Sequence, residues 1–167
     1  MKDKLSFTPV NRYQPGDLFN LIYSSYKELI KGYSPKNRQK YIGEWKKFDK
    51  NAFNNLDIGK CVFVTCCNGK PVGVVSYDPR NFPEYGVIGQ NCVIPSSQGQ
   101  EIGEKQVLEI LRIFKENHCR VAKVTTGDHP FFVPAQKMYL SGGFKEAKRR
   151  REDDKDFGEI DYEVNLK

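Results

Sequence analysis

One strand–loop–helix pattern near the middle of the chain constrains its fold more than any other feature. Within residues 87–103, a hydrophobic run reaches Pro95 and continues into a polar loop rich in glutamine and glycine. The apolar spacing that follows predicts an amphipathic helix that starts at Gln98 or Gly99 and runs through Asn117. The first turn of a helix has backbone N–H groups without intrahelical partners, and such groups bind phosphates well. The sequence therefore predicts a site for a phosphate or pyrophosphate at this helix start.

Length and composition indicate one globular domain over residues 1–167. With 38% hydrophobic and 29% charged residues, the chain has the balance of a folded protein rather than a disordered one. No apolar stretch is long enough to span a bilayer, and the first residues lack the apolar core of a secretory signal. The five cysteines form no C-x-x-C pair and only two histidines are present, so neither a disulfide framework nor a zinc site is indicated. We expect a cytoplasmic protein with no metal and no membrane partner.

The net charge of +6 is carried by the N-terminal part of the chain. Residues 1–60 hold twelve Lys and Arg against six Asp and Glu, and the charges of the remainder balance. This excess is typical of a solvated, lysine-rich helical surface, and it also suits an acidic partner, an acidic substrate or nucleic acid. The basic residues form no recognised nucleic-acid motif, and Arg149–Arg151 is followed at once by Glu152–Asp154. A nucleic-acid partner is therefore disfavoured.

The hydrophobic pattern predicts elements in the order β-α-α-β-β-β-α-β-α-β-β. Asn68-Gly69, between two apolar runs, is typical of a two-residue hairpin turn. The expected strands are Leu5–Val10, Cys61–Cys67, Pro71–Tyr77, Tyr85–Val93, Val121–Thr126, Phe144–Arg151 and Ile160–Leu166. The expected helices are about 17–32, 35–54, 98–117 and 134–141. This order predicts an α/β fold with a mixed, mostly antiparallel sheet flanked by helices.

Two motifs stand out in the second part of the chain. Gln98–Gly103 reads Gln-Gly-Gln-Glu-Ile-Gly, and Ala135–Tyr139 is followed by Gly143-Phe144. They resemble two patterns of the GNAT superfamily of N-acetyltransferases: the pyrophosphate loop Gln/Arg-x-x-Gly-x-Gly/Ala, and Ala-x-x-aliphatic-Tyr followed by Gly-Phe. The chain departs from these patterns at Glu101, where the loop has its first glycine, and at Phe132, where an asparagine is often found.

The resemblance covers Lys60–Leu166 and implies a GNAT-like domain in which 1–59 forms acceptor-side helices and 60–167 forms the acetyl-CoA-binding core. It implies acetyl-CoA as cosubstrate and direct transfer of the acetyl group to a primary amine in a ternary complex. It also implies that the strand ending at Val93 splays from its parallel neighbour, so that the Val93 amide polarises the thioester carbonyl. The alternative for this strand is a normally paired central position in the sheet. The implied cofactor-binding residues are Val93, Gln98, Gly99, Gln100, Glu101, Ile102, Gly103 and Ala135.

Tyr139 is the expected general acid. The departing thiolate needs a proton, which a phenol with an ordinary pKa near 10 can supply within hydrogen-bond reach. The alternative for Tyr139 is a core tyrosine on a short helix. The general base stays open among Glu84, Asp128 and His129, because an amine must lose a proton before or during attack. The alternatives are a solvated surface position for Glu84 and a simple turn for Asp128-His129.

Glu101 and two cysteines carry further alternatives. A carboxylate at a helix start interacts favourably with the dipole and competes with phosphate for it, so we expect weaker CoA binding than with glycine. Cys92 or Cys119 could accept an acyl group, but packing is the favoured role of both.

The nature of the acceptor is constrained only by charge. The basic N-terminal helices favour a small-molecule amine that bears a carboxylate over a polycation, and the chain is expected to be a monomer or a homodimer. Two other classes of function stay compatible with the sequence: a CoA-binding sensor without catalysis, and a basic nucleic-acid- or ribosome-associated protein.

Overall fold

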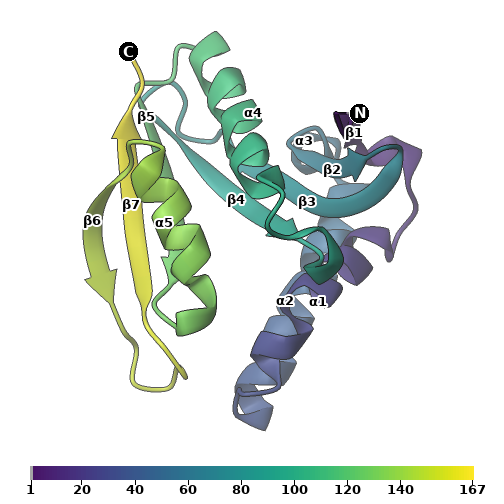
Figure 1. Cartoon of the computed structure of the whole chain (residues 1–167), viewed down its shortest axis with the longest axis vertical. Coiled ribbons are helices and arrows are strands. Elements are labelled where there is room, and N and C mark those ends of the chain that lie inside the picture. The colour runs from purple at the N-terminus through teal and green to yellow at the C-terminus, as the bar shows by residue number, and fades with distance from the viewer. Residues whose placement is uncertain (1) are drawn as a thin grey trace. The chain divides into compact units, whose positions relative to one another are not determined.

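The computed structural model describes residues 2–167, and its elements follow the predicted order with one addition, the short helix α3 (Figure 1). The strands are β1 (Leu5–Pro9), β2 (Val62–Cys67), β3 (Lys70–Asp78), β4 (Tyr85–Val93), β5 (Val121–Gly127), β6 (Lys145–Arg150) and β7 (Glu159–Asn165). The helices are α1 (Asp17–Ile30), α2 (Pro35–Asn54), α3 (Leu56–Gly59), α4 (Ile102–Glu116) and α5 (Val133–Ser141). Short 3-10 turns cover Val10–Arg12, Pro95–Ser97 and Pro130–Phe132.

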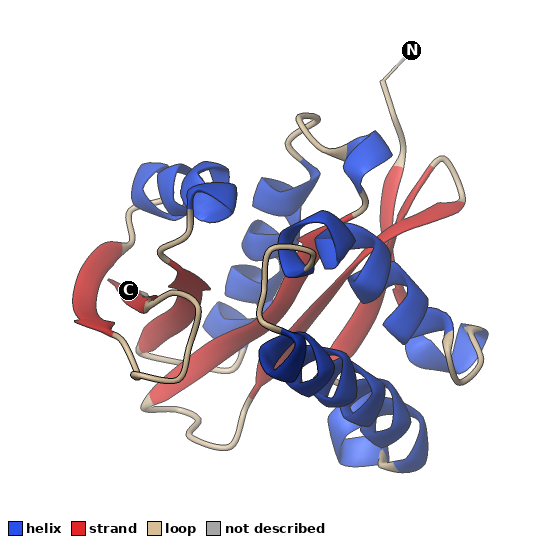
Figure 2. Cartoon of the chain, turned by 90° about the horizontal axis from the view of Figure 1, so that it is seen from below, coloured by secondary structure: helices blue, strands red, loops and turns tan. Residues whose placement is uncertain are grey.

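The strands form a sheet in the order β1-β2-β3-β4-β5-β7-β6. Strands β4 and β5 are parallel, whereas β1–β2, β2–β3, β5–β7 and β6–β7 are antiparallel. The fold is therefore the expected α/β class, a mixed and mostly antiparallel sheet flanked by helices (Figure 2). None of the helices within residues 2–167 is long and apolar enough to cross a membrane.

The chain divides into two compact units. The first contains the residues up to Ser76 together with Gln90–Gln106, and the second contains Tyr77–Gly89 and Val107–Lys167. Strand β4 thus contributes to both units, its carboxyl part to the first and its amino part to the second.

The first unit is built on the meander β1–β2–β3. Asn68 and Gly69 both have positive φ angles, 52° and 80°, as a type I′ turn requires, so the predicted hairpin is confirmed. Valines at alternate positions of β2 and β3, Val64 and Val74, pair with each other and are fully buried. The helices α1 and α2 run side by side in this unit, with buried Leu18, Ile22 and Leu29 on α1 and Trp45 on α2 (Figure 1).

The second unit is built on β5, β7 and β6. Seven residue pairs join β5 to β7, from Val121↔Asn165 to Gly127↔Glu159. Its core includes the ring of Phe114, which is fully buried and makes edge contacts with Tyr77 and Phe82. Only glycine fits at position 86, because a Cβ atom there would lie 2.7 Å from both the Phe114 ring and the Phe82 ring.

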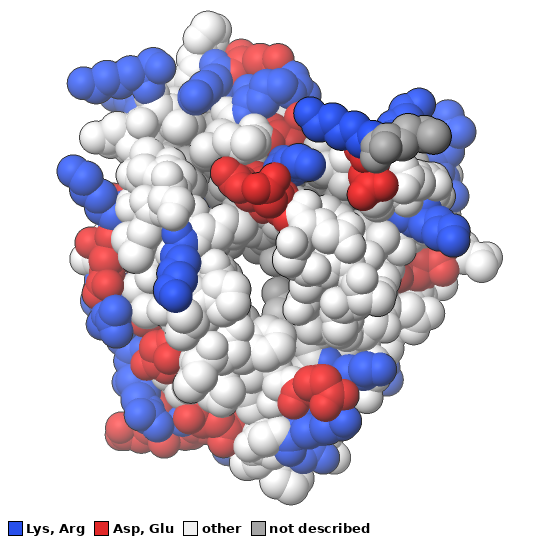
Figure 3. Space-filling view, viewed as in Figure 1, with Lys and Arg blue, Asp and Glu red and all other residues white. Residues whose placement is uncertain are grey.

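Exposed charged side chains of both signs occur in both units. On the face shown in Figure 3, Lys and Arg are interspersed with Asp and Glu. Several opposite charges pair with a residue three positions away in the chain, such as Lys31 with Glu28 at 2.7 Å and Arg112 with Glu109 at 2.7 Å. Exposed pairs of this kind contribute little to stability, roughly 0.2–1 kcal/mol each.

Candidate functional site

The loop between β4 and α4 is held by hydrogen bonds to β3, within the loop itself and to the end of β4. Ile94 N–H donates to Val72 O of β3 at 2.8 Å, and Ser97 N–H donates back to Ile94 O at 2.9 Å. The side-chain amide of Gln98 donates to Val93 O at 2.9 Å. The glutamine at the head of the motif and the strand residue expected to activate the thioester are therefore directly linked.

Two residues of this loop have left-handed backbone conformations. Gly99 has φ 77° and Glu101 has φ 60°. An L-residue adopts this region at a cost of roughly 1–2 kcal/mol, whereas glycine adopts it freely. Position 101 is where the resembled pyrophosphate loop has its first glycine, and Glu101 has a backbone conformation that glycine adopts freely.

The predicted helix start at Gln98 or Gly99 is wrong, because α4 begins at Ile102. Residues with left-handed backbone conformations cannot belong to a right-handed helix, so α4 can begin only after Glu101. Lys105 N–H donates to Glu101 O at 3.1 Å. The N–H groups of Ile102, Gly103 and Glu104 thus belong to the first turn, whose amides have no acceptor within their helix.

Strand β4 runs beyond its ladder with β5. The parallel pairs extend from Tyr85↔Val121 to Ile88↔Val124, four pairs in all. After the last of these pairs β4 continues to Val93 and β5 continues to Gly127. The pairing thus covers the amino ends of the two strands, and Val93 lies at the other end of β4.

A buried glutamine on α4, Gln106, contacts this part of β4 and was not found from the sequence. Its side-chain nitrogen donates to Thr65 Oγ1 at 2.8 Å and to Cys92 O at 3.1 Å, and the residue is fully buried. One signal could have revealed it: Gln106 lies four residues from both Ile102 and Ile110, on the apolar face of the helix.

In the second unit, the motif from Ala135 to Phe144 covers most of α5 and the turn that ends this helix. Gly143, with φ 90°, reverses the chain after α5, and Phe144 N–H donates to Tyr139 O at 3.1 Å. The Tyr139 ring is buried, 5.6 Å from the ring of Phe144 and 5.9 Å from that of Tyr162. Ala135 lies one turn earlier on α5 and is partly buried.

Glu84 lies at the amino ends of the parallel strands. It directly precedes β4, is exposed, and pairs with Arg120 at 3.3 Å, just before β5. Ligands of α/β sheets bind at the carboxyl ends of strands. This placement, and the ion pair with Arg120, argue against Glu84 as the general base.

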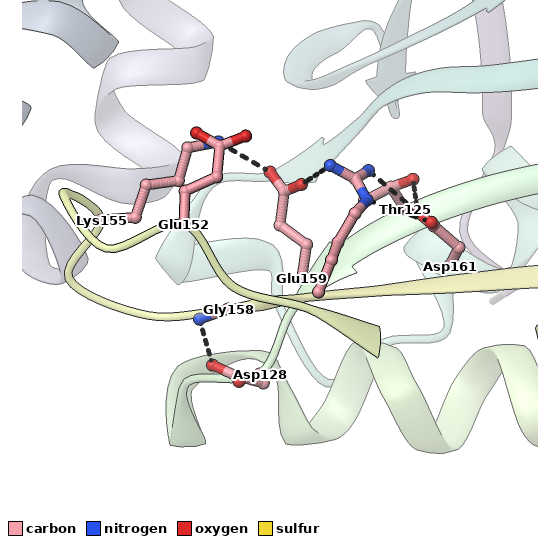
Figure 4. Close-up of polar contacts among 8 residues, drawn as sticks. Thr125, Asp128, Glu152, Lys155, Gly158, Glu159 and Asp161 are labelled. Atoms are coloured by element: carbon pink, nitrogen blue, oxygen red, sulfur yellow. Dashed lines mark hydrogen bonds and ion pairs between the residues drawn. The ribbon is translucent and has the colours of Figure 1, made fainter. Parts of the chain in front are cut away.

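His129 and Asp128 follow the carboxyl end of β5, but both are engaged in holding the backbone. His129 Nδ1 accepts from Phe131 N–H at 3.0 Å, which in the neutral ring leaves the proton on Nε2, so the ring presents a donor rather than a base. Asp128 Oδ1 accepts from Gly158 N–H at 2.8 Å (Figure 4). Asp128 N–H also donates to Gly158 O, at 3.0 Å.

The turn that Asp128 holds is reinforced by an ion-pair network (Figure 4). Arg150 of β6 pairs with Glu159 and with Asp161 of β7, the latter at 3.0 Å, and Lys155 pairs with Glu159 at 3.6 Å. The Arg150 hydrogen bond holds the pKa of Asp161 below its usual range. This network fixes the β6–β7 connection beside the end of β5.

Both cysteines weighed as nucleophiles have the character of packing residues. Cys92 and Cys119 are buried, and burial raises the pKa of both thiols, that of Cys92 to about 11. A thiol with a raised pKa is a poor nucleophile at neutral pH. Within residues 2–167, no group of three or more His, Cys, Asp and Glu side chains is placed to hold a metal ion.

Comparison with known proteins identifies the family. A sequence model of the acetyltransferase (GNAT) family matches residues 22–144, well over half of the chain, and the chain therefore belongs to this family. Comparison with curated protein sequences gives no match.

Solved structures with this fold are similar over nearly their whole length. The PaiA N-acetyltransferase from Thermoplasma acidophilum, in complex with coenzyme A, has a TM-score of 0.73 at 15% identity, with 99% of this chain and 100% of that chain covered. A GNAT-family acetyltransferase from Staphylococcus aureus Mu50 has a TM-score of 0.69 at 19% identity, with 98% and 100% covered. The microcin C7 self-immunity acetyltransferase MccE, in complex with acetyl-CoA and AMP, has a TM-score of 0.71 at 14% identity, with 99% and 94% covered.

Proposed function

We propose that the protein is an N-acetyltransferase that moves the acetyl group of acetyl-CoA to the primary amine of a small molecule, directly, in a ternary complex. The observation that carries the proposal is the loop Gln98–Glu101, whose left-handed turns lead into the first-turn amides of α4 in a chain of the GNAT family. The solved complexes of PaiA with coenzyme A and of MccE with acetyl-CoA support the choice of cosubstrate.

The pyrophosphate binds the backbone of this loop. The amides of Ile102 and Gly103, with those of Gly99, Gln100 and Glu101, supply donors, and the positive end of the α4 dipole adds to them. The Gln98 N–H is not among them, because it donates to Pro95 O at 3.3 Å. This arrangement needs no lysine. The carboxylate of Glu101 is exposed, so it weakens the interaction with the phosphates but does not block it.

The thioester carbonyl accepts a hydrogen bond from the Val93 amide. Successive residues of a strand direct their backbone groups to opposite edges, and Ile94 N–H donates to β3. The Val93 N–H therefore faces the edge of β4 away from β3, where the strand has run beyond its parallel pairs. A donor at this position stabilises the oxyanion as it develops.

Tyr139 supplies the proton that completes the reaction. The neutral amine attacks the carbonyl carbon, the tetrahedral intermediate collapses with cleavage of the C–S bond, and the thiolate takes the phenolic proton. The amine loses one proton to solvent, and the phenolate takes one proton back from solvent, so the phenol is restored. Ala135, one turn away on α5, contributes to cofactor binding through its small side chain. We assign no side chain as general base, since Glu84 and His129 are both otherwise engaged.

The acceptor binds through the N-terminal helices of residues 1–59, and the acetyl-CoA-binding core lies in 60–167. The excess of basic residues in the first sixty favours an acceptor that carries a carboxylate.

Calorimetry with acetyl-CoA, followed by release of free CoA thiol across a panel of amines, tests this function. Saturable binding together with amine-dependent thiol release is the expected result. Binding without thiol release from any amine would instead indicate a CoA sensor. No binding of acetyl-CoA at millimolar concentration would refute both functions, and salt-dependent RNA binding would then favour a nucleic-acid partner.

A further inference from the structure

We propose that Gln106 is a positioning residue for the Val93 amide, an inference that rests on the proposed acetyltransferase function. Gln106 acts through the peptide group that joins Cys92 to Val93. Its side-chain nitrogen donates to the Cys92 carbonyl oxygen at 3.1 Å. That carbonyl and the Val93 N–H belong to the same planar peptide unit and point in opposite directions. A side chain that holds the carbonyl therefore also sets the direction of the N–H.

The orientation of the Gln106 amide is determined by its neighbours. The Cys92 carbonyl can only accept a hydrogen bond, so the group of Gln106 that faces it must be the NH₂. The same nitrogen donates its second hydrogen to Thr65 Oγ1, at an N···O distance of 2.8 Å. Both anchors are buried, Thr65 on β2 and Cys92 on β4, so the glutamine is fixed at two points.

The space for this contact is made by Gly73 of β3. A Cβ atom at Gly73 would collide with Cys92 O and would lie 2.9 Å from the Gln106 side-chain nitrogen. Because Gly73 has no side chain, the Cys92 carbonyl and the Gln106 side chain have room to form their hydrogen bond beside β3. Another backbone group of β4 is also held by a side chain, since Gln90 N–H donates to Ser76 Oγ at 2.8 Å.

The remaining oxygen of Gln106 argues that the residue serves more than stability. Oε1 is buried and has no hydrogen-bond partner among the residues that the structure describes. An unsatisfied buried acceptor destabilises a fold, so the two hydrogen bonds that the Gln106 nitrogen donates come with a loss at its oxygen. The fold accepts this defect at the position that contacts the peptide of Val93. A donor on the carbonyl also polarises the peptide and strengthens its N–H as a donor.

Infrared spectroscopy of acetyl-CoA labelled with ¹³C at the acetyl carbonyl tests this role, because the carbonyl stretch reports the hydrogen bond from Val93 directly. In the native protein the bound stretch should lie at lower wavenumber than in free acetyl-CoA. Gln106→Met should return the stretch toward its free value and lower kcat about tenfold or more, since loss of an oxyanion donor typically costs 10²–10³-fold. The Kd for acetyl-CoA should stay close to that of the native protein. The thermal midpoint should fall, because the buried Cys92 carbonyl and Thr65 hydroxyl lose their donor.

Ser76→Ala is the matched control, because it releases a β4 backbone group outside the Cys92–Val93 peptide and should leave both the stretch and kcat unchanged. Gln106→Glu gives a second readout. Its protonated carboxyl can donate to Cys92 O and its carboxylate cannot, so kcat should fall as pH rises through the pKa of the new group. This readout decides the question if Gln106→Met proves unstable.

An unchanged carbonyl stretch and kcat in Gln106→Met would overturn the inference, as would a pH profile of Gln106→Glu identical to that of the native protein. Neither result would affect the proposed function. That function fails separately, if the native protein binds no acetyl-CoA.

Discussion

Asp49 of α2 accepts hydrogen bonds from Gly16 N–H through both carboxylate oxygens, at 2.9 and 3.1 Å. Gly16 is the N-cap of α1 and has no side chain with which to cap it. Phe19 N–H also donates to Asp49, at 3.0 Å, so a buried carboxylate of the second helix satisfies the start of the first. At the other end of α1, the Arg38 guanidinium of α2 donates to Ile30 O at 3.0 Å. Helix α2 thus caps both ends of α1.

Asp49→Ala should lower the free energy of unfolding by about 2 kcal/mol, because it removes a charged cap and leaves partly buried N–H groups without an acceptor. Asp49→Asn retains one acceptor oxygen and should lose less. Denaturant unfolding measures both changes. The matched control is Glu44→Ala on the exposed face of α2, which should stay within about 0.5 kcal/mol of the native protein. Equal stability of Asp49→Ala and the control would contradict the capping role.

Glu101→Gly should raise the stability of the protein by about 0–1.7 kcal/mol. Glycine removes the left-handed cost of roughly 1–2 kcal/mol at φ 60°, less the roughly 0.3–1 kcal/mol that the carboxylate gains at the helix start. It should also tighten CoA binding, since it removes a negative charge beside the pyrophosphate.

Glu101→Gln separates these two effects, because it removes the charge and keeps the strained backbone. Thermal unfolding and calorimetry with CoA should find the gain in stability only in the glycine variant, and the gain in affinity in both. The difference in affinity between the native protein and Glu101→Gln should shrink at high salt. If the two variants unfold at the same temperature, the left-handed backbone at this position is not a source of strain.

The order of elements was predictable because its signals are local. Asn68-Gly69 determines a turn by its own conformational preferences, and the apolar periodicity of α1, α2 and α4 reflects faces that the helices bury. The predicted start of α4 was wrong for a local reason too. Glu101 adopts a left-handed backbone conformation that is unfavourable for its side chain, and helix propensity does not predict such a conformation.

The rest of the site depends on contacts between residues far apart in the chain. Gln106 meets Thr65 across 41 residues, and Asp49 meets Gly16 across 33. Neither pairing has a sequence signal beyond a polar residue at a buried helical position. The sequence left the general base open among several residues, and the contacts of Glu84 with Arg120 and of His129 with the Phe131 amide have no sequence signal.

Tyr139→Phe should lower kcat by about 10²-fold or more if Tyr139 is the general acid, because proton transfer by a positioned side chain contributes roughly 10²–10⁴-fold. The Kd for acetyl-CoA should change little, since the ring and its packing on Phe144 are retained. Steady-state thiol release with a good amine acceptor measures the effect. Tyr162→Phe is the matched control, a buried neighbouring ring on β7 that should keep its turnover. Equal rates in the two variants would remove Tyr139 from the mechanism.

Cys92 should make the protein less stable in alkali. Burial raises the pKa of its thiol from 9.0 to about 11, so the folded state retains a proton that the unfolded state loses. A pKa raised by folding contributes stability that is full below the unfolded value and is lost as pH rises, here between about 9 and 11. Urea unfolding of the native protein and of Cys92→Ala across this range should find a shallower decline in the variant. Cys92→Ala should also keep its acetyltransferase turnover at pH 7.5, because a thiol with this pKa is protonated there and takes no acyl group. Parallel declines in the free energy of unfolding of the two proteins would contradict the raised pKa. Loss of turnover in a stable Cys92→Ala would favour Cys92 as the nucleophile.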